Sequence, residues 1–165
     1  MKTLILLRHA KSSWKDESLE DIDRPLNDRG IRATEVIGNY LRKQEIVPDL
    51  IISSPATRAR QTIDLVLKAA RLKLNPRFDE RIYEASVHRL LEVVSQIEET
   101  ANTAMLVGHN PGFEELVESL TGEIKRFPTA GLAGIELDVE KWSKSRAGIG
   151  ALKWLVTPRK LKRDE

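Results

Sequence analysis

The sequence predicts an α/β fold: a three-layer α/β/α sandwich whose central sheet is mostly parallel, with antiparallel strands at its edge. Two observations support this prediction. Short, nearly all-apolar runs recur along the chain, as is typical of strands that are covered on both faces. Amphipathic helical patterns lie between these runs, and alternating strands and helices build a layered sheet through right-handed crossovers. The length of 165 residues argues for a single domain over 1–165.

The individual elements follow in chain order. Apolar runs predict buried strands over residues 3–7, 50–53 and 104–107. Helical periodicity predicts helices over residues 31–43, 55–71 and 87–97, and a fourth helix after Asn110-Pro111. Residues 132–139 and 152–157 alternate apolar and polar side chains, which favours exposed, antiparallel edge strands. The polar stretch 10–26 has no clear periodicity and predicts a long loop, of a length that is often functional.

Composition excludes several classes of protein. The chain has 41% apolar and 32% charged residues, as a water-soluble globular domain does. It has no cysteine, which excludes disulfide scaffolds, thiol nucleophiles and cysteine-based zinc sites. The longest apolar runs, such as residues 4–7, are too short to span a bilayer. The first residues lack a signal-peptide pattern, so we expect a cytoplasmic protein that does not bind a membrane.

The positive net charge comes from one end of the chain. The chain has 27 lysines and arginines and 25 acidic residues. Residues 157–165 hold four of the basic residues and two of the acidic ones. The remainder is formally neutral. We therefore expect a flexible basic tail over 157–165 and no nucleic-acid interface, because nucleic-acid binding requires a basic surface patch. A monomer is expected.

Several polar residues follow the predicted strands directly. Arg8-His9 comes after the first strand, Gly108-His109 after the strand at 104–107, and Ser53-Ser54-Pro55 after the strand at 50–53. Arg58 lies near the start of the next helix. Ligands of open parallel sheets bind at the carboxyl ends of the strands. If these strands are parallel, two histidines and two arginines converge on one crevice.

Each of these residues has a plain structural explanation when it is taken alone. An arginine after a strand can be a surface residue, and a histidine there can be a hydrogen-bonded structural residue. The third histidine, His88, lies beside the apolar stripe of its helix and is expected to be solvent-exposed. These residues can form a functional site only if the fold brings their side chains together in one crevice.

Phosphoryl transfer is the chemistry that such a group fits. Arginine forks match phosphate oxygens, and nearby positive charge lowers the pKa of an imidazole, which keeps it neutral and nucleophilic. A second, cationic histidine could stabilise charge on the transferring group. The helix after Asn110-Pro111 could add amide N–H donors. The sequence therefore indicates a reaction through a phosphohistidine.

A metal site is the competing interpretation of two histidines. Such a site needs further ligands, and the chain has no His-x-x-x-His pair, no aspartate-rich loop and no cysteine. Two flanking arginines would also repel a divalent cation. Glycine-rich nucleotide-binding motifs do not occur. We therefore expect no metal and no cofactor.

Three spaced motifs resemble those of one known family. Leu7-Arg8-His9-Ala10 is similar to the Arg-His-Gly signature of the histidine phosphatase superfamily, the phosphoglycerate mutase-like proteins. Residues 53–62 resemble its second motif and residues 107–111 its third. The short length and the Arg24-Pro25-Leu26…Gly30 stretch resemble the SixA-type phosphohistidine phosphatase branch. The resemblance spans nearly the whole chain and implies a phosphoglycerate mutase-like fold.

The resemblance also implies roles for particular residues. Arg8, His9, Arg58 and His109 would form the phosphate pocket, with His9 as the phosphorylated nucleophile and without metal or organic cofactor. The general acid of the family commonly lies between the second and third motifs, where Glu84 matches best by position; the alternatives are Asp79 and Glu80. Ala10 replaces the usual glycine, which indicates an ordinary backbone at that position.

The expected function is a phosphatase that acts through phospho-His9 on phosphohistidine in a protein. A phosphomonoesterase acting on small phosphoesters and a non-catalytic phosphate- or phosphoprotein-binding module are the alternatives. A binding module would not need a nucleophile. Few residues separate Arg58 from His109, so little chain remains to cap the pocket, and an open pocket suits a side chain presented on a protein surface.

Overall fold

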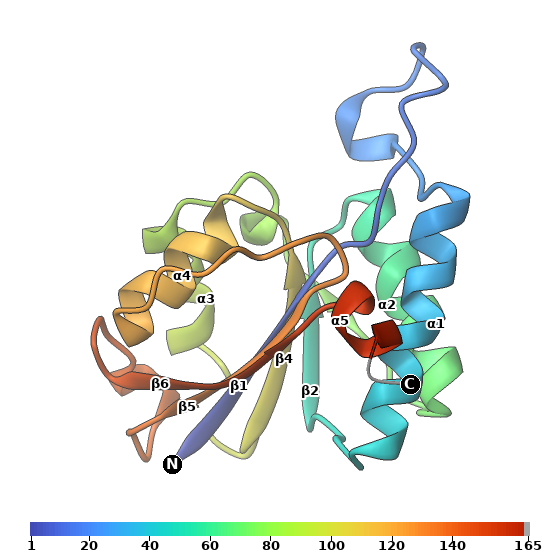
Figure 1. Ribbon diagram of the computed structural model, residues 1–165. Helices are drawn as coiled ribbons and strands as arrows, with labels where there is room; N and C mark the ends of the chain where they lie inside the picture. The colour runs from blue at the N-terminus through green and yellow to red at the C-terminus, as the bar shows by residue number, and fades with distance from the viewer. Residues whose placement is uncertain (164–165) are drawn as a thin grey trace.

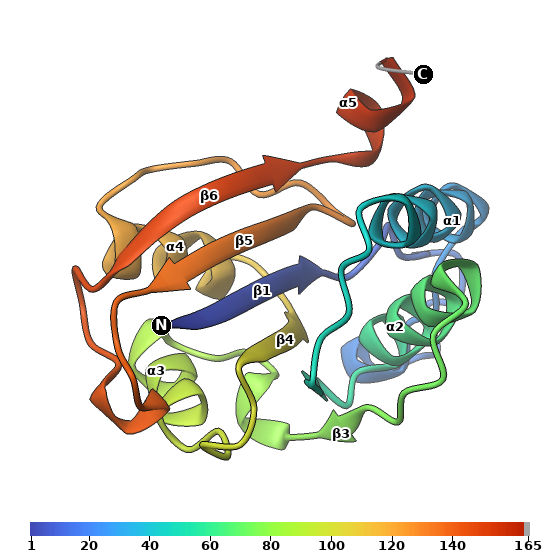
Figure 2. The ribbon, with the colours of Figure 1, turned by 90° about the horizontal axis from the view of Figure 1, so that it is seen from below.

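A six-stranded sheet forms the centre of the computed structural model, which describes residues 1–163. The strands are β1 (Lys2–Arg8), β2 (Leu50–Ser53), β3 (Arg77–Phe78), β4 (Thr103–Gly108), β5 (Leu132–Leu137) and β6 (Gly150–Val156). Their order in the sheet is β3-β2-β4-β1-β5-β6 (Figures 1 and 2). The strands β1 to β4 pair in parallel, whereas β5 is antiparallel to β1 and β6. The predicted mostly parallel sheet is confirmed.

Helices cover both faces of the sheet and complete the predicted three layers (Figure 2). The α-helices are α1 (Asp28–Lys43), α2 (Thr57–Ala70), α3 (Val87–Ser95), α4 (Gly112–Thr121) and α5 (Pro158–Arg163). The 3₁₀ turns are η1 (Asp21–Asp23), η2 (Glu80–Ile82) and η3 (Trp142–Lys144). Side-chain caps define two helix starts: Asn27 accepts a hydrogen bond from the Gly30 amide, and Ser86 accepts one from the Arg89 amide.

Each inner strand contributes side chains to two separate hydrophobic cores. In β1, Leu4 and Leu6 face the core beneath α3 and α4, whereas Ile5 and Leu7 face the core beneath α1 and α2. All four are at most 1% exposed. Because successive side chains of a strand point to opposite faces, burial on both faces requires the continuous apolar run that the sequence shows. Burial of each such side chain contributes about 1.5–3 kcal/mol.

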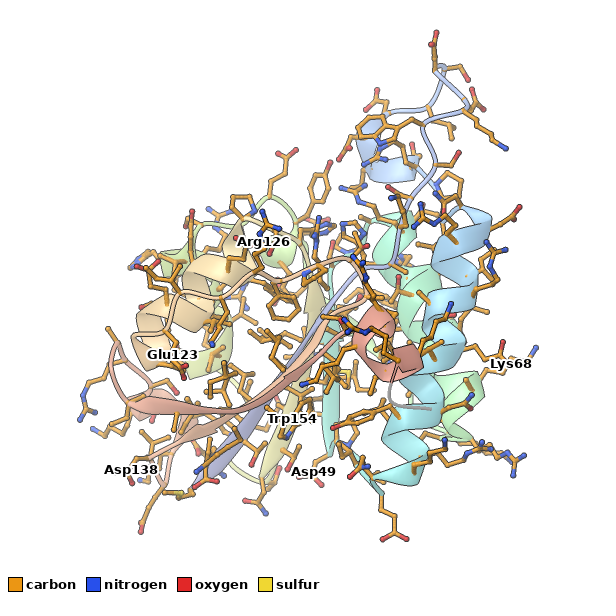
Figure 3. The ribbon with its side chains drawn as sticks, viewed as in Figure 1. Asp49, Lys68, Glu123, Arg126, Asp138 and Trp154 are labelled. Atoms are coloured by element: carbon orange, nitrogen blue, oxygen red, sulfur yellow. The ribbon has the colours of Figure 1, made fainter. Side chains whose placement is uncertain are left out.

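The prediction that residues 132–139 form an exposed edge strand is wrong for β5, which is buried between β1 and β6. One non-apolar position of this strand is covered by a side chain from β6. Gly134 faces the indole of Trp154 on β6, and a Cβ at Gly134 would lie 2.3 Å from that ring. Trp154, labelled in Figure 3, packs on Tyr40 of α1, with ring centroids 6.1 Å apart. A large side chain from β6 thus fills the space above the glycine. Strand β6 is the edge strand that the sequence predicts.

The carboxyl-terminal segment contains a helix that the sequence analysis did not predict. Residues 158–163 of the expected flexible tail form helix α5, and Leu161 packs against the core beneath α1 and α2. The Leu161 amide donates to the Thr157 carbonyl at 3.0 Å. The apolar side chain of Leu161 therefore anchors an otherwise basic segment. Residues 164 and 165 of the expected tail lie outside the described residues. Within residues 1–163, none of the helices combines the length and apolar character needed to cross a membrane.

The segment 10–26 is a long loop, as predicted, and it is held by a buried arginine. Arg24 is 7% exposed. It donates from Nη1 to Ser12 Oγ at 2.7 Å and from Nε to Asp21 Oδ1 at 3.1 Å. Its guanidinium also lies 3.5 Å from the ring centroid of Trp14. These contacts link the two arms of the loop next to the carboxyl ends of β1 and β2.

Candidate active site

Strand pairing brings the two predicted histidines together. In the parallel pair β1–β4, Arg8 is opposite Gly108, so the residues that follow, His9 and His109, leave the sheet side by side. Their ring centroids are 5.1 Å apart. The predicted convergence is therefore present. The third histidine, His88, has a side chain that is 85% exposed, as expected.

The imidazole of His9 has a defined tautomer. The ring is 7% exposed, and Nδ1 lies 2.7 Å from the carbonyl oxygen of Ala10. A carbonyl can only accept a hydrogen bond, so Nδ1 carries the proton in the neutral ring. The lone pair is then on Nε2. A neutral imidazole with a fixed tautomer is suited to nucleophilic attack.

Burial keeps His9 neutral. Loss of hydration is the main cause that lowers the pKa of His9 from 6.5 to about 4, and the charges of Arg58, Arg8 and Arg24 lower it further. The hydrogen bond to Ala10 acts in the opposite direction. The sequence predicts the direction of this shift from like charge alone. In the structure burial contributes more, since a charged ring would lose most of its contact with water.

The surroundings of His109 also favour the neutral form of its ring. Burial, followed by the proximity of His9 and Arg58, lowers the pKa of His109 to about 3. Its Nε2 is hydrogen-bonded to Ser54 Oγ at 2.7 Å. Arg58 and Arg8 lower the pKa of His109 and the nearby Asp21 carboxylate raises it, but no carboxylate forms an ion pair with the ring within residues 1–163. A further anion beside the ring would favour its cationic form.

Two arginines line the same cavity. Arg8 donates from Nη1 to the Phe127 carbonyl at 3.0 Å, and Arg58, in the first turn of α2, is 6% exposed. The Nε atoms of both guanidinium groups are buried and lack a hydrogen-bond partner among residues 1–163. A buried, unpaired donor is unfavourable by about 1–3 kcal/mol.

The sequence analysis missed two residues that engage Arg58. Asp21, in the long loop, accepts from Arg58 Nη1 through its carbonyl at 2.7 Å and from Nη2 through Oδ2 at 3.0 Å. The hydroxyl of Tyr83 donates to the same Oδ2, and this hydrogen bond, together with Arg58, lowers the pKa of Asp21 to about 2. The Tyr83 ring packs edge-on against His109 at 5.5 Å. One indirect signal for Asp21 is present in the sequence: it lies in the long loop, whose length indicates a functional role.

Of the three candidate general acids, only Glu84 lines the cavity. It is exposed and has a φ of 52°, in the left-handed region that non-glycine residues rarely adopt. Asp79 is paired with Arg81 at 2.7 Å, which lowers the pKa of Asp79. Glu80 lies in η2 and is exposed. Strained residues cluster at functional sites, so the conformation of Glu84 favours it over the other two.

The cavity has a volume of about 880 Å³, and the long loop forms part of its wall. Beyond the residues above, the loop contributes Lys11, Trp14 and Lys15 to its lining. The segment 110–112 at the start of α4 also lines it, as predicted for a helix that could offer amide donors. Among residues 1–163, no three histidine, cysteine, aspartate or glutamate side chains are grouped as metal ligands.

Comparison with known proteins agrees with this geometry. Residues 4–127 match the histidine phosphatase superfamily (branch 1). The chain belongs to this superfamily. The match begins within β1, which precedes His9, and extends beyond His109. The superfamily resemblance inferred from the three motifs is therefore confirmed.

Individual relatives place the chain more closely within the superfamily. An uncharacterized protein of Mycobacterium tuberculosis is 32% identical over 164 residues, which cover 93% of this chain and 100% of that protein. The crystal structure of a candidate phosphohistidine phosphatase SixA from Agrobacterium tumefaciens is 30% identical, with a TM-score of 0.82 over 95% of this chain and 98% of the other. A SixA structure complexed with tungstate has a TM-score of 0.83 at 23% identity and covers 96% and 99% of the chains. The fold is phosphoglycerate mutase-like.

Proposed function

We propose that this histidine phosphatase superfamily member hydrolyses phosphohistidine on a protein through a phosphoryl group held transiently on His9. The observation that carries the proposal is the state of His9: a buried, neutral ring whose Nδ1 proton is held by Ala10 and whose Nε2 is unprotonated. Arg8 and Arg58 line the same cavity, and their charges act on the His9 ring. A nucleophile between two phosphate-binding groups is the arrangement that covalent phosphoryl transfer requires.

In the first step, His9 Nε2 attacks phosphorus, and the bond between phosphorus and the leaving nitrogen breaks. Arg8 and Arg58 hold the non-bridging oxygens and offset the charge that develops on them. The leaving imidazole nitrogen takes a proton, which Glu84 supplies as the general acid. Bound phosphate also raises the pKa of His109, because an anion beside the ring favours its charged form, and His109 can then donate to a phosphate oxygen.

In the second step, water attacks the phosphoryl group on His9, and the bond between Nε2 and phosphorus breaks. Glu84, now a carboxylate, takes a proton from the attacking water, so the acid of the first step is the base of the second. The products are inorganic phosphate and the neutral His9 ring with its proton still on Nδ1. Both steps leave the hydrogen bond between Nδ1 and Ala10 in place.

The open cavity supports a protein substrate. Between Arg58 and His109, the chain forms only the rest of α2, then β3, η2, α3 and β4. None of these elements is an inserted cap, and the cavity is not enclosed on all sides. A phosphorylated side chain on a folded surface can enter such a cavity. The resemblance to SixA at 30% identity favours phosphohistidine among the phosphorylated side chains.

The test compares substrates directly. A peptide carrying phosphohistidine, the matching phosphoserine peptide and p-nitrophenyl phosphate are each given to the wild-type chain, and phosphate release is measured. The phosphohistidine peptide should have the highest kcat/KM. His9→Ala should abolish turnover of all three, whereas His88→Ala, an exposed residue outside the cavity, should not. A higher kcat/KM for the small ester would instead assign the chain as a phosphomonoesterase, and no turnover of any substrate would point to a binding module.

A further inference from the structure

A second cavity, of about 590 Å³, is lined by five basic side chains that the proposed reaction does not use. We call it the basic groove; its cations are Lys11, Arg29, Arg32, Arg159 and Lys162. Arg29 and Arg32 lie on α1, and Arg159 and Lys162 lie on α5, a helix that packs beside α1 (Figure 1). Within residues 1–163, no acidic side chain lines the groove, and none of the five cations takes part in an ion pair. Like charges gathered in this way attract an anion.

The basic groove is continuous with the active-site cavity. Lys11 and Thr129 line both. The backbone of Lys11 is held against the start of α1, where its carbonyl accepts from the Asn27 amide at 3.0 Å. A Cβ at Gly30 would lie 2.1 Å from that carbonyl oxygen, so only glycine permits this approach. A chain leaving the active site over Lys11 and Thr129 enters the basic groove directly.

Charge differs between the two sides of the active-site cavity. On the side of α3 and α4, the exposed residues Glu84 and Glu115 line the cavity. On the side of α1 and α5, the lining is basic and continues into the groove. A bound segment with acidic residues on one side of its phosphorylated residue would therefore have one preferred direction.

The chemistry of the groove favours carboxylates on a peptide. Three of the five cations are arginines, whose planar forks match carboxylates. The volume exceeds that of a single phosphate, and Thr129 and Thr157 add hydroxyls that can bond a peptide backbone. Among the described residues, no aromatic side chain lines it, whereas single-stranded nucleic acids are bound on aromatic stacking platforms. The five long side chains are exposed, so they can reach a segment that lies on the surface.

We infer that the basic groove binds an acidic segment of the phosphoprotein substrate, adjacent to the phosphorylated residue. This inference rests on the proposed function and specifies the class of substrate. The groove selects the partner, and the active site carries out the reaction.

The experiment measures selectivity within each variant. One peptide carries a run of glutamates beside its phosphohistidine, and a second has glutamines in their place; glutamates on the amino and the carboxyl side are tested separately. The readout is the ratio of kcat/KM for the acidic peptide to that for the neutral one. A change that affects all substrates alike cancels from this ratio. The groove variant is Arg32→Gln with Arg159→Gln. The matched control is Lys43→Gln with Lys160→Gln, which also removes one charge from α1 and one from α5 but lies outside the groove.

We expect the wild-type chain to prefer the acidic peptide in one of the two orientations. In the groove variant, the ratio of kcat/KM for the acidic peptide to that for the neutral one should fall roughly 5- to 10-fold, because two exposed ion pairs with the peptide are lost. The control variant should keep the wild-type ratio. Raised salt should reduce the preference in the wild type. Equal hydrolysis of the acidic and neutral peptides, or a preference that survives in the groove variant, would overturn the inference and leave the proposed function standing. Hydrolysis of none of the peptides would overturn the proposed function itself. Retention of single-stranded RNA, lost in the groove variant, would reassign the groove to nucleic acid.

Discussion

Replacing His9 by asparagine should reduce the loss of stability that the chain suffers in acid. The folded state holds the His9 ring neutral, with its pKa lowered to about 4 by burial and by the arginines. The unfolded state binds the proton with a pKa of about 6.5. Below that pH the unfolded state binds more protons than the folded state, so the free energy of unfolding falls as the pH falls. The fall is absent above pH 6.5 and complete below about pH 4.

The magnitude follows from the two pKa values. Between about pH 7 and pH 5, a ring with these values lowers the free energy of unfolding by about 2 kcal/mol. His109, whose pKa is lowered to about 3, should contribute a similar loss, so the two rings together account for about 4 kcal/mol. Asp21, with a pKa of about 2, titrates below this interval. In His9→Asn, only His109 should lower the free energy of unfolding over this pH interval. The fall should therefore be about half of that in the wild-type chain.

Denaturant unfolding at the two pH values measures the effect. The quantity of interest is the change in the free energy of unfolding with pH within each protein, so a general loss of stability in the variant does not enter. His88→Asn is the control, because it also removes one histidine, but from an exposed position outside the cavity. An equal fall with pH in wild type and His9→Asn would refute the argument that burial keeps this ring neutral.

Four further predictions follow from the site and its supports. Arg58→Lys should lower kcat/KM roughly 10-fold or more in steady-state assays, because lysine keeps the charge but loses the planar fork; an unchanged value would make Arg58 structural. Glu84→Gln should reduce kcat/KM for an alkyl phosphate about 10²–10⁴-fold and much less for p-nitrophenyl phosphate, since a poor leaving group needs the proton more; equal losses would indicate a positioning role, and no loss would return Asp79 and Glu80 to consideration. Activity should survive incubation with EDTA, and its loss with recovery on added metal would contradict the metal-independent scheme. Gly38→Ala should destabilise the fold by about 1–3 kcal/mol in denaturant unfolding, because its Cβ would lie 2.4 Å from Ala69 Cβ across the α1–α2 contact; unchanged or increased stability would mean that the helices can separate without cost.

Much of the fold could be predicted because its information is local. The strands at 3–7, 50–53 and 104–107 are continuous apolar runs, and such runs are required where both faces of a strand are buried. Once these strands are parallel, their carboxyl ends lie together. The proximity of His9 and His109, which are 100 positions apart in the sequence, then follows from topology alone.

The features that the sequence did not predict depend on contacts between distant segments. The burial of β5 at Gly134 depends on Trp154, whose side chain from another strand occupies the space beside the glycine. The order of α5 depends on Leu161, a single apolar residue in a basic segment. Asp21 reaches Arg58 from a loop without periodicity. The neutral state of His109 depends on the depth of its burial, which the sequence does not encode locally.

Identification of the phosphorylated atom tests the central claim most directly. The wild-type chain is mixed with radiolabelled phosphohistidine peptide, quenched rapidly in alkali and digested, and the labelled residue is assigned by mass spectrometry and phosphorus NMR. Because Nδ1 of His9 donates to Ala10, the account predicts label on His9, on Nε2 alone. Label on Nδ1, label on another residue, or turnover without any labelled intermediate would contradict it.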